Sequence, residues 1–529
     1  MFFVNFKVFF RLLFILFPFC LFSETKQFTL SYNDDPSSTI VIGWSGDSAM
    51  VYYDTIDYGT NYSLYSQTNG INRTGGAHSI TRNFSRLSNL QANTLYFFVL
   101  HDVQGDTSLR FSFRTLSDNP MDSVSFISGG DSRDGFKVLG VYTENCPSGN
   151  CIEQRRKGNR LVAKIRPDFI SFNGDFVMNQ VTSNTNTEWN NWLEDWQLTI
   201  SADGRMFPLL FSLGNHEDNS DAYEMFDVPM EEYYVININN GLLRFYCLNS
   251  ELNPCTETNQ LDWFTNDLQL HSGSSNDPLW KFAQYHVATY SMALGYGLES
   301  TQMECWVNLF EQYDISLAIE SHGHVTKWSY PCVAKNDNSD FELSSSNSGV
   351  VYIGEGQWGA PHRQLDFLGL NQKPYIRDMD VFDGFFYITV NPSKTTIRSV
   401  KFKDVDSVQA HTSDALGKDL PFGIAIWEPT NGNQIVIENQ ASKIHENVLS
   451  FCTVYPTISS DYIQIEFQNN TSTKTLELYN SLGLKCKKIS VNQAKKYTMD
   501  ISGICSGVSY LYVKDQNGNI MPFRIVKTP

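Results

Sequence analysis

The sequence predicts a multidomain protein in which two β-sandwiches flank a central α/β domain. Three observations support this prediction. The 529 residues are too many for one hydrophobic core. Strands alternate with helical patterns only in the middle of the chain, and short alternating strands separated by turn residues fill both ends. An aromatic content of 14% is typical of folded rather than disordered sequence.

The first 23 residues have the pattern of a secretory signal peptide. Lys7 and Arg11 precede an apolar stretch from Leu12 to Phe22, and the small Ser23 follows. The stretch is too short to span a bilayer comfortably, and no later segment is apolar over a sufficient length. We therefore expect a secreted or cell-surface protein with no membrane span.

The charge balance argues against a nucleic-acid partner. Without residues 1–23 the chain has 37 basic and 57 acidic residues, a net charge of −20. An acidic enzyme that acts on anions would need a local positive field at its site.

Nine cysteines remain beyond the leader, and in an exported protein we expect them to have structural roles. Close pairs could form disulfides: Cys146 with Cys151, Cys247 with Cys255, and, as a third possibility, Cys305 with Cys332. The repeated C-x-x-C spacing of a zinc site is absent from the sequence.

Residues 24–118 are predicted to form the first β-sandwich. Its strands are "TIVIGW", "AMVYYDT", "TLYFFVLHDV" and "SLRFSFRT". No cluster of ionisable residues appears in this region, so we expect it to be a scaffold.

Residues 119–425 are predicted to form the α/β domain. Strands are expected at "SVSFIS", "DFISFN", "MFPLLFSL", "WKFAQYHVATY", "ISLAIE", "GVVYIGEG", "GFFYITVN" and "KTTIRSVKF", and helices at "RRKGNRLVAKIR" and "ECWVNLFEQYD". A linker over 426–446 leads to a small β-sandwich over 447–529, where asparagine and glycine turns separate strands such as "YIQIEF".

Residues of the kind that bind metals follow several of the central strands. They are Asp131 in "FISGGDSRDG", Asp175 in "FISFNGDFV", Asn215 and His216 in "SLGNHED", His286 in "AQYHVATY", and His322 and His324 in "SLAIESHGHV". Each motif alone has an ordinary explanation, since Gly-Asp is common in turns and a lone histidine is common in a strand. Together they would meet at the edge where open α/β sheets place their sites.

Carboxylate, amide and imidazole groups suit Zn²⁺, Mn²⁺ or iron. Six such groups would already exceed what one tetrahedral ion needs, so we expect a pair of metal ions that share one carboxylate.

The five motifs in this order resemble the calcineurin-like metallophosphoesterases, and the β-sandwich before them resembles the fibronectin type III-like domain of the purple acid phosphatase branch. This resemblance covers about residues 27 to 400 and implies an α/β/β/α catalytic domain. It implies that Asp175 bridges two ions, that Asp131 and His324 complete one site, and that His216 faces the substrate. Asn215, His286 and His322 would complete the other site.

Two positions depart from the family pattern. Purple enzymes have a tyrosine where this chain has Met178, and non-purple relatives have a histidine where it has Arg133. One metal is therefore left with three evident protein ligands, and water or Asn179 could supply another. Arg133 could bind phosphate oxygens, or it could form an ion pair with Asp134 or another carboxylate.

The resemblance implies a phosphatase that hydrolyses phosphomonoesters through a metal-activated hydroxide, with His216 as the proton donor. A phosphodiesterase with the same fold is one alternative. A surface binding or adhesive protein with a weakened metal site is another.

The segments "VYPTISSDYIQIEF", "LELYNSLGLK" and "DISGICSGVSYLYVKDQNG" resemble the C-terminal sorting domain of type IX secretion cargo. This implies handling by the secretion machinery. The alternative is a terminal β-sandwich that binds carbohydrate or only packs against the rest of the chain.

Overall fold

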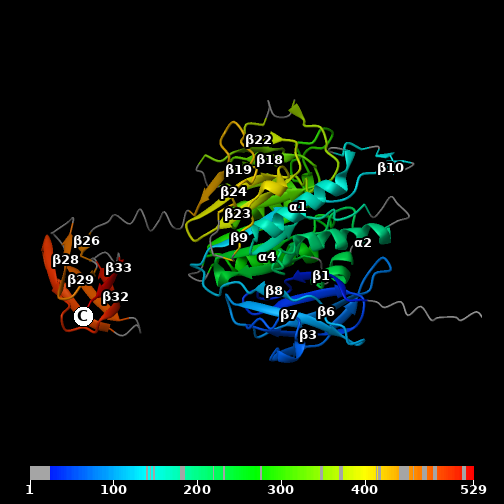
Figure 1. Ribbon diagram of the computed structural model, residues 1–529. Coiled ribbons are helices and arrows are strands. Elements are labelled where there is room, and N and C mark those ends of the chain that lie inside the picture. The colour runs from blue at the N-terminus through cyan, green and yellow to red at the C-terminus, as the bar shows by residue number, and fades with distance from the viewer. Residues whose placement is uncertain are drawn as a thin grey trace, which may run out of the picture. The chain divides into compact units, whose positions relative to one another are not determined.

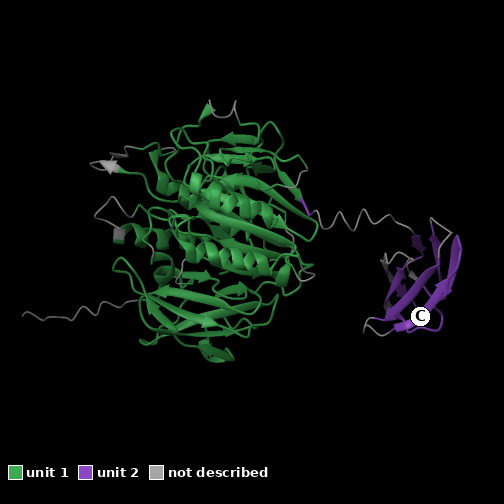
Figure 2. Cartoon of the chain, turned by 180° about the vertical axis from the view of Figure 1, so that it is seen from behind, with its two compact units in different colours: residues 1–437 green, residues 438–529 purple. Residues whose placement is uncertain are grey.

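The computed structural model describes residues 24–138, 141–142, 144–146, 149–178, 185–218, 220–229, 233–273, 277–345, 349–367, 373–412, 414, 419–439, 452–456, 458–467, 473–480, 485–514 and 520–528. The predicted signal peptide and residues 440–446 of the predicted linker lie outside these ranges. The chain divides into two compact units, residues 1–437 and 438–529 (Figure 2).

A ten-stranded sheet runs through the first unit. Its strands, in spatial order, are β25 (Ile435–Glu438), β24 (Lys394–Lys401), β23 (Gly384–Val390), β9 (Val124–Gly129), β12 (Phe169–Phe172), β13 (Leu209–Phe211), β1 (Lys26–Ser31), β2 (Ile40–Ser45), β6 (Arg82–Leu87) and β5 (Arg73–Gly75). Strands β9, β12 and β13 are parallel neighbours, so their carboxyl ends share one edge.

A seven-stranded sheet packs against the central part of the first sheet. It contains β14 (Tyr234–Ile238), β15 (Leu243–Cys247), β16 (Trp280–Val287), β17 (Leu317–Ser321), β21 (Val351–Gly354), β18 (Thr326–Ser329) and β22 (Ile376–Asp380). Phe245 on β15 contacts the rings of Phe126 and Phe169 on the first sheet, with centroids 5.6 and 6.1 Å apart. The inner faces of the two sheets therefore form one aromatic core.

Helices cover the outer faces of both sheets. They are α1 (Cys151–Ile165), α2 (Thr185–Trp196), α3 (Asp221–Phe226), α4 (Thr258–Leu270), α5 (Ser300–Gln302) and α6 (Asn308–Gln312), with a π-helical turn over Met303–Val307. On β16, Phe282 belongs to the core between the sheets, whereas Ala283 and Tyr285 pack with Phe264 of α4 and Phe310 of α6. This alternation confirms the predicted α/β/β/α layers.

The N-terminal sandwich shares the ten-stranded sheet with the central region. Its second sheet contains β4 (Gln67–Asn69), β3 (Ala49–Asp54), β7 (Leu95–Asp102) and β8 (Phe111–Arg114). Ser31 on β1 pairs with Leu209 on β13, and β1 also lies beside α2 (Figure 1). Two short hairpins complete this unit: β10 (Lys137–Val138) with β11 (Val141–Tyr142), and β19 (Cys332–Ala334) with β20 (Phe341–Leu343).

The second unit is a small β-sandwich, as predicted for the fold class. One sheet contains β26 (Cys452–Tyr455), β28 (Tyr462–Phe467) and β31 (Lys496–Asp500), and the other contains β27 (Ile458–Ser459), β33 (Ile520–Lys527), β32 (Gly507–Lys514), β29 (Lys474–Asn480) and β30 (Lys485–Val491). Ile463, Ile465, Leu476, Leu478 and Leu511 form its core.

The disulfides differ in part from those expected. Cys146 is bonded to Cys151 as predicted, but the second disulfide joins Cys255 to Cys305. The suggested pairs of Cys247 with Cys255 and of Cys305 with Cys332 are wrong. Cys247 lies in the buried strand β15, where its sulfur contacts Nε2 of Gln284 at 3.1 Å, and Cys332 is also buried as a thiol.

Candidate metal centre

Three candidate ligands follow adjacent parallel strands of the first sheet. Asp131 follows β9, Asp175 follows β12, and Asn215 follows β13. The first two loops are joined, because Asp131 N donates to the Gly174 carbonyl at 3.0 Å and Ser132 N donates to the Asp175 carbonyl at 2.9 Å. The strand order thus brings residues distant in sequence to one edge of the sheet.

The other candidates come from the second sheet. His286 is near the end of β16, and His322 and His324 follow β17. The backbone N–H of His322 donates to Oδ2 of Asp131 at 3.0 Å, which joins the loops of the two sheets. All six candidate ligands therefore meet where the carboxyl ends of both sets of parallel strands face each other.

The side chains form two groups suited to a cation, and Asp175 belongs to both. One group contains Asp175, His286 and His322, and the other contains Asp131, Asp175 and His324. Within each group the ligand atoms lie within 4.8 Å of one another. Oδ1 of Asn215 lies 3.2 Å from Nε2 of His286, so the amide borders the first group.

Hydrogen bonds orient two of the imidazoles toward the carboxylates. Nδ1 of His286 lies 2.7 Å from the Asn173 carbonyl, and Nδ1 of His324 lies 2.6 Å from the Pro361 carbonyl. A carbonyl can only accept, so both Nδ1 atoms carry a proton, and in the neutral form of each ring Nε2 offers a lone pair. Such carbonyl partners are typical of metal-binding histidines.

Asp131 and His324 belong to the second group alone, and their facing atoms are suited to bind a cation. Nε2 of His324 faces Oδ1 of Asp131 at 3.1 Å, and neither atom has a hydrogen-bond partner among the described residues. Two buried electron-rich atoms that face each other are stabilised by a cation bound between them.

The electrostatics of the site point the same way. Burial lowers the pKa of His324 well below its ordinary value, and burial and the charge of His286 lower that of His322 to about 3. Both imidazoles are thus neutral and able to act as ligands. Burial also opposes charge on His286, but Asp175 and Asp131 outweigh it and raise its pKa to about 9. The two carboxylates therefore favour positive charge between them.

The backbone around these residues is unusual. Asp131, Asp175, His322 and His324 all have left-handed conformations, with φ between 52° and 70°. Gly356 borders the Asp131 carboxylate, with φ of 88°, and a Cβ atom there would lie 1.8 Å from Oδ2 of Asp131. Any residue other than glycine at this position would displace the Asp131 carboxylate.

His216 lies at the mouth of the site. Its Nε2 is 3.7 Å from Oδ2 of Asp175, and its backbone N–H donates to Oδ1 of the same carboxylate at 3.2 Å. The side chain is 13% exposed, and burial lowers its pKa. The imidazole can thus meet a ligand that enters from solvent.

Arg133 is buried and forms an ion pair with the partly exposed Glu144. Its Nη1 and Nη2 lie 3.2 and 3.1 Å from the two carboxylate oxygens, and only 3% of its side chain is exposed. Its Nε has no hydrogen-bond partner among the described residues. Met178, at the position of the family tyrosine, is also buried, while Asn179 lies outside the described residues.

Sequence motifs did not assign roles to three residues at this site. Glu217 lies within "SLGNHED", and its buried carboxylate accepts hydrogen bonds from the backbone N–H groups of Gly214, Asp175 and Phe176 at 2.8 to 2.9 Å. Tyr296 and Arg363 lie beside His322, and neither belongs to a recognisable motif. Only the folding of two distant loops brings them there.

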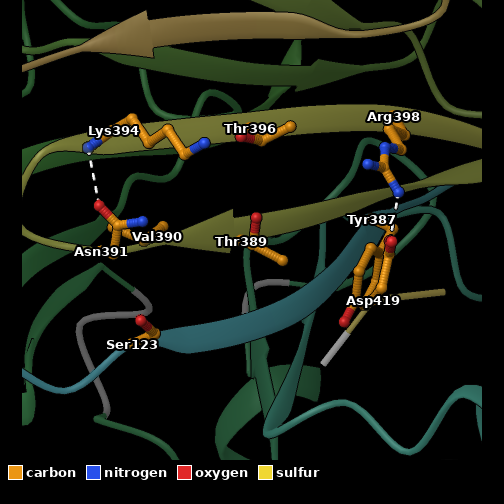
Figure 3. A pocket seen from close by; sticks show the side chains of 9 residues that line it. All are labelled: Ser123, Tyr387, Thr389, Val390, Asn391, Lys394, Thr396, Arg398 and Asp419. Carbon is orange, nitrogen blue, oxygen red and sulfur yellow. Dashed lines mark hydrogen bonds and ion pairs between the residues drawn. The ribbon is translucent and has the colours of Figure 1, made fainter. Parts of the chain in front are cut away.

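Two other features of the first unit lie apart from these ligands. A polar cavity of about 280 Å³ borders β23 and β24, but Arg398 at its wall is paired with Asp419, and no candidate ligand lines it (Figure 3). His78, Asp218 and Asp221 form a third group of metal-binding types, in which Nε2 of His78 is already 2.7 Å from Oδ1 of Asp221.

Comparisons with known proteins agree with this geometry. Residues 147–326 match the family model described as calcineurin-like phosphoesterase, and residues 453–527 match the model described as secretion system C-terminal sorting domain. The first match contains every candidate ligand except Asp131. The central region therefore has the calcineurin-like phosphoesterase fold, and residues 453–527 form a type IX sorting domain. No curated protein matches the sequence.

Two solved structures share the fold. The purple acid phosphatase PPD1 from yellow lupin (Lupinus luteus) seeds is 15% identical, with a TM-score of 0.59 over 79% of this chain and 74% of that one. PhoD is 13% identical, with a TM-score of 0.56 over 79% of this chain and 91% of its own. At these identities the likeness shows the fold alone.

The sorting domain indicates secretion or display at the cell surface, and therefore handling by the secretion machinery. Within the described ranges, no helix has both the length and the apolar character that crossing a bilayer requires.

Proposed function

We propose that this protein is a secreted phosphatase, of the acid phosphatase-like type, that uses two metal ions to hydrolyse phosphomonoesters. The observation that carries the proposal is that Asp175 belongs to both cation-suited groups. A shared carboxylate suits a pair of ions about 3.5 to 4 Å apart.

In this proposal Asp131, Asp175 and His324 hold one ion. Asp175, Asn215, His286 and His322 hold the other. The ions, which we expect to be iron, zinc or manganese, would activate a water molecule and neutralise charge on the phosphate. The remaining steps belong to the side chains around them.

His216 is the proposed proton donor to the leaving oxygen. Burial disfavours its charged form, but the negative charge of a phosphate beside it would favour that form again. Arg133 would contact a phosphate oxygen through Nε, since its other guanidinium nitrogens face Glu144.

The positive charge around the site supports a phosphomonoester over a phosphodiester. Arg363 donates to the His322 carbonyl and pairs with no carboxylate among the described residues, whereas the charge of Arg133 is balanced by Glu144. A phosphomonoester dianion gains more from this charge than a phosphodiester monoanion does.

The test is hydrolysis of aryl phosphate mono- and diesters by the purified chain with added Mn²⁺, Zn²⁺ or iron. We expect the monoester to have the higher kcat/KM. A preference for the diester would make the protein a phosphodiesterase. If neither ester is hydrolysed, an enzymatic role is contradicted.

For export, we propose that residues 1–23 are a signal peptide and that the sorting domain takes the fold across the outer membrane. We also propose that the N-terminal sandwich is a fibronectin type III-like domain that acts as a scaffold. Deletion of residues 447–529 should leave folded protein inside the cell, and normal secretion of the deleted chain would refute the sorting role.

A further inference from the structure

Tyr296 and Arg363 border the candidate metal centre from two separate loops. The Arg363 guanidinium lies over the Tyr296 ring, 4.5 Å from its centroid. The Tyr296 ring meets the His322 ring edge to face at 5.3 Å, and Nη1 of Arg363 donates to the His322 carbonyl. Both side chains therefore touch a candidate ligand.

Backbone pairing holds these two loops together. Ala293 forms a β-bridge with Leu365, and Leu294 N donates to the Gln364 carbonyl at 2.8 Å. Beneath them the buried carboxylate of Glu355 accepts from Met292 N at 2.7 Å. The fold thus fixes the backbone position of Arg363.

Arg363 also has unused hydrogen-bonding capacity. Among the described residues no carboxylate pairs with it, and only Nη1 has a hydrogen bond. Nε and Nη2 remain as the fork that binds an oxyanion in a bidentate manner. Arg133, by contrast, is largely occupied by Glu144.

We propose that Arg363 binds the phosphate group of the substrate and that Tyr296 is a positioning residue that holds the guanidinium in place. This inference rests on the proposed function. Stacking fixes the plane of the guanidinium, so less conformational entropy is lost when phosphate binds. The substrate would thus be a phosphate ester with anionic oxygens that Arg363 can bind while the metal ions, when present, neutralise the remaining charge.

The experiment combines kinetics on an aryl phosphate monoester with calorimetric titration of inorganic phosphate, using the full metal-loaded chain. We expect Arg363→Gln to raise KM and weaken phosphate binding roughly 10- to 100-fold, the value of a charged hydrogen bond, with a smaller change in kcat. Tyr296→Ala should show part of this loss, and Tyr296→Phe should restore it.

Arg377→Gln is the matched control. Arg377 stacks over Trp328 at 5.2 Å and donates to the Gln434 carbonyl at 2.9 Å, but it contacts no candidate ligand. We expect its KM and phosphate affinity to equal those of the parent.

Three results would overturn or redirect the inference. If Arg363→Gln keeps the parent KM and phosphate affinity, the inference is wrong. If the parent hydrolyses no phosphate ester, the proposed function is wrong. The phosphate titration then still tests Arg363, because equal phosphate affinities of the parent and of Arg363→Gln would refute its role. If Arg363→Gln does not fold, unchanged phosphate affinity in Tyr296→Ala and Arg363→Lys would refute it.

Discussion

Within the "SLGNHED" segment, neighbouring side chains face different parts of the molecule. Asn215 faces His286, His216 lies beside Asp175, and Glu217 turns back to the backbone. Each side chain thus offers a separate test of the site.

His216 should affect the chemical step more than metal binding. We expect His216→Asn to lower kcat by roughly 10²- to 10⁴-fold, the usual contribution of a positioned proton donor. Metal content, measured by mass spectrometry of the digested protein, should stay at the parent value. A variant with parent kcat would show that His216 does not transfer the proton.

Glu217 should matter for stability. Both its oxygens accept backbone N–H groups, so the amide of Glu217→Gln would turn an N–H donor toward another N–H. We expect a loss of about 1–3 kcal/mol in the free energy of unfolding, measured by denaturant titration. Glu428→Gln, at an exposed site outside any helix or strand, is the control and should change it by less than about 0.5 kcal/mol. Equal effects would contradict this role.

The limits of sequence reasoning are also visible among residues. Asp131, Asp175 and Asn215 could be found because each follows a recognisable strand. Arg363 and Glu144 could not, since their neighbours at the site lie in other loops. The local sequence carries no signal for such contacts.

Among the elements, α1 and α2 are joined by a buried ion pair that contacts one loop of the candidate metal site. Asp195 on α2 accepts from Nε of Arg155 on α1 at 3.0 Å, and Nη1 of Arg155 donates to the Ser132 carbonyl at 3.0 Å. The helices therefore support the loop that carries Asp131.

Breaking this pair should be costly. Asp195→Asn leaves Arg155 buried with an uncompensated charge, and we expect the free energy of unfolding to fall by roughly 3–5 kcal/mol. The exposed pair of Glu153 with Arg160 on α1 is the control, and Glu153→Gln should cost less than about 1 kcal/mol. A similar small loss in both variants, in the same denaturant titration, would argue against the supporting role.

Several elements could be predicted because their patterns are local. The helix expected at "RRKGNRLVAKIR" begins earlier, at Cys151, where Asn150 caps its first turn. No helix is predicted over the residues of α2, because asparagine and threonine residues interrupt its apolar pattern. Its apolar residues nevertheless have helical spacing and are buried: Trp189, Trp192, Leu193 and Trp196. The helix expected at "ECWVNLFEQYD" begins at Ser300 and includes a π-helical turn.

At the scale of the whole molecule, the sequence does not predict which distant strands pair with each other. Strand β1 pairs with β13 across about 180 residues, so the N-terminal sandwich and the central region share one sheet. Similarly, residues 435–438 lie in the expected linker but form β25 at the edge of that sheet.

The division into two units predicts separable functions. A chain that ends at residue 437 should keep its fold, metal content and kcat, because the candidate site lies wholly within residues 1–437. The truncated chain, purified from cells, is compared with the full chain by thermal unfolding and ester hydrolysis. A large loss of kcat would show that the second unit contributes to the site.

The most direct test of the account is the metal content of Asp175→Asn. Because Asp175 belongs to both cation-suited groups, we expect the parent to hold about two ions per chain and the variant to lose affinity for both, by more than the roughly 10- to 100-fold typical of outer-shell changes. Inductively coupled plasma mass spectrometry after dialysis measures this. A parent without metal, or a variant that retains both ions, would contradict the shared-carboxylate centre.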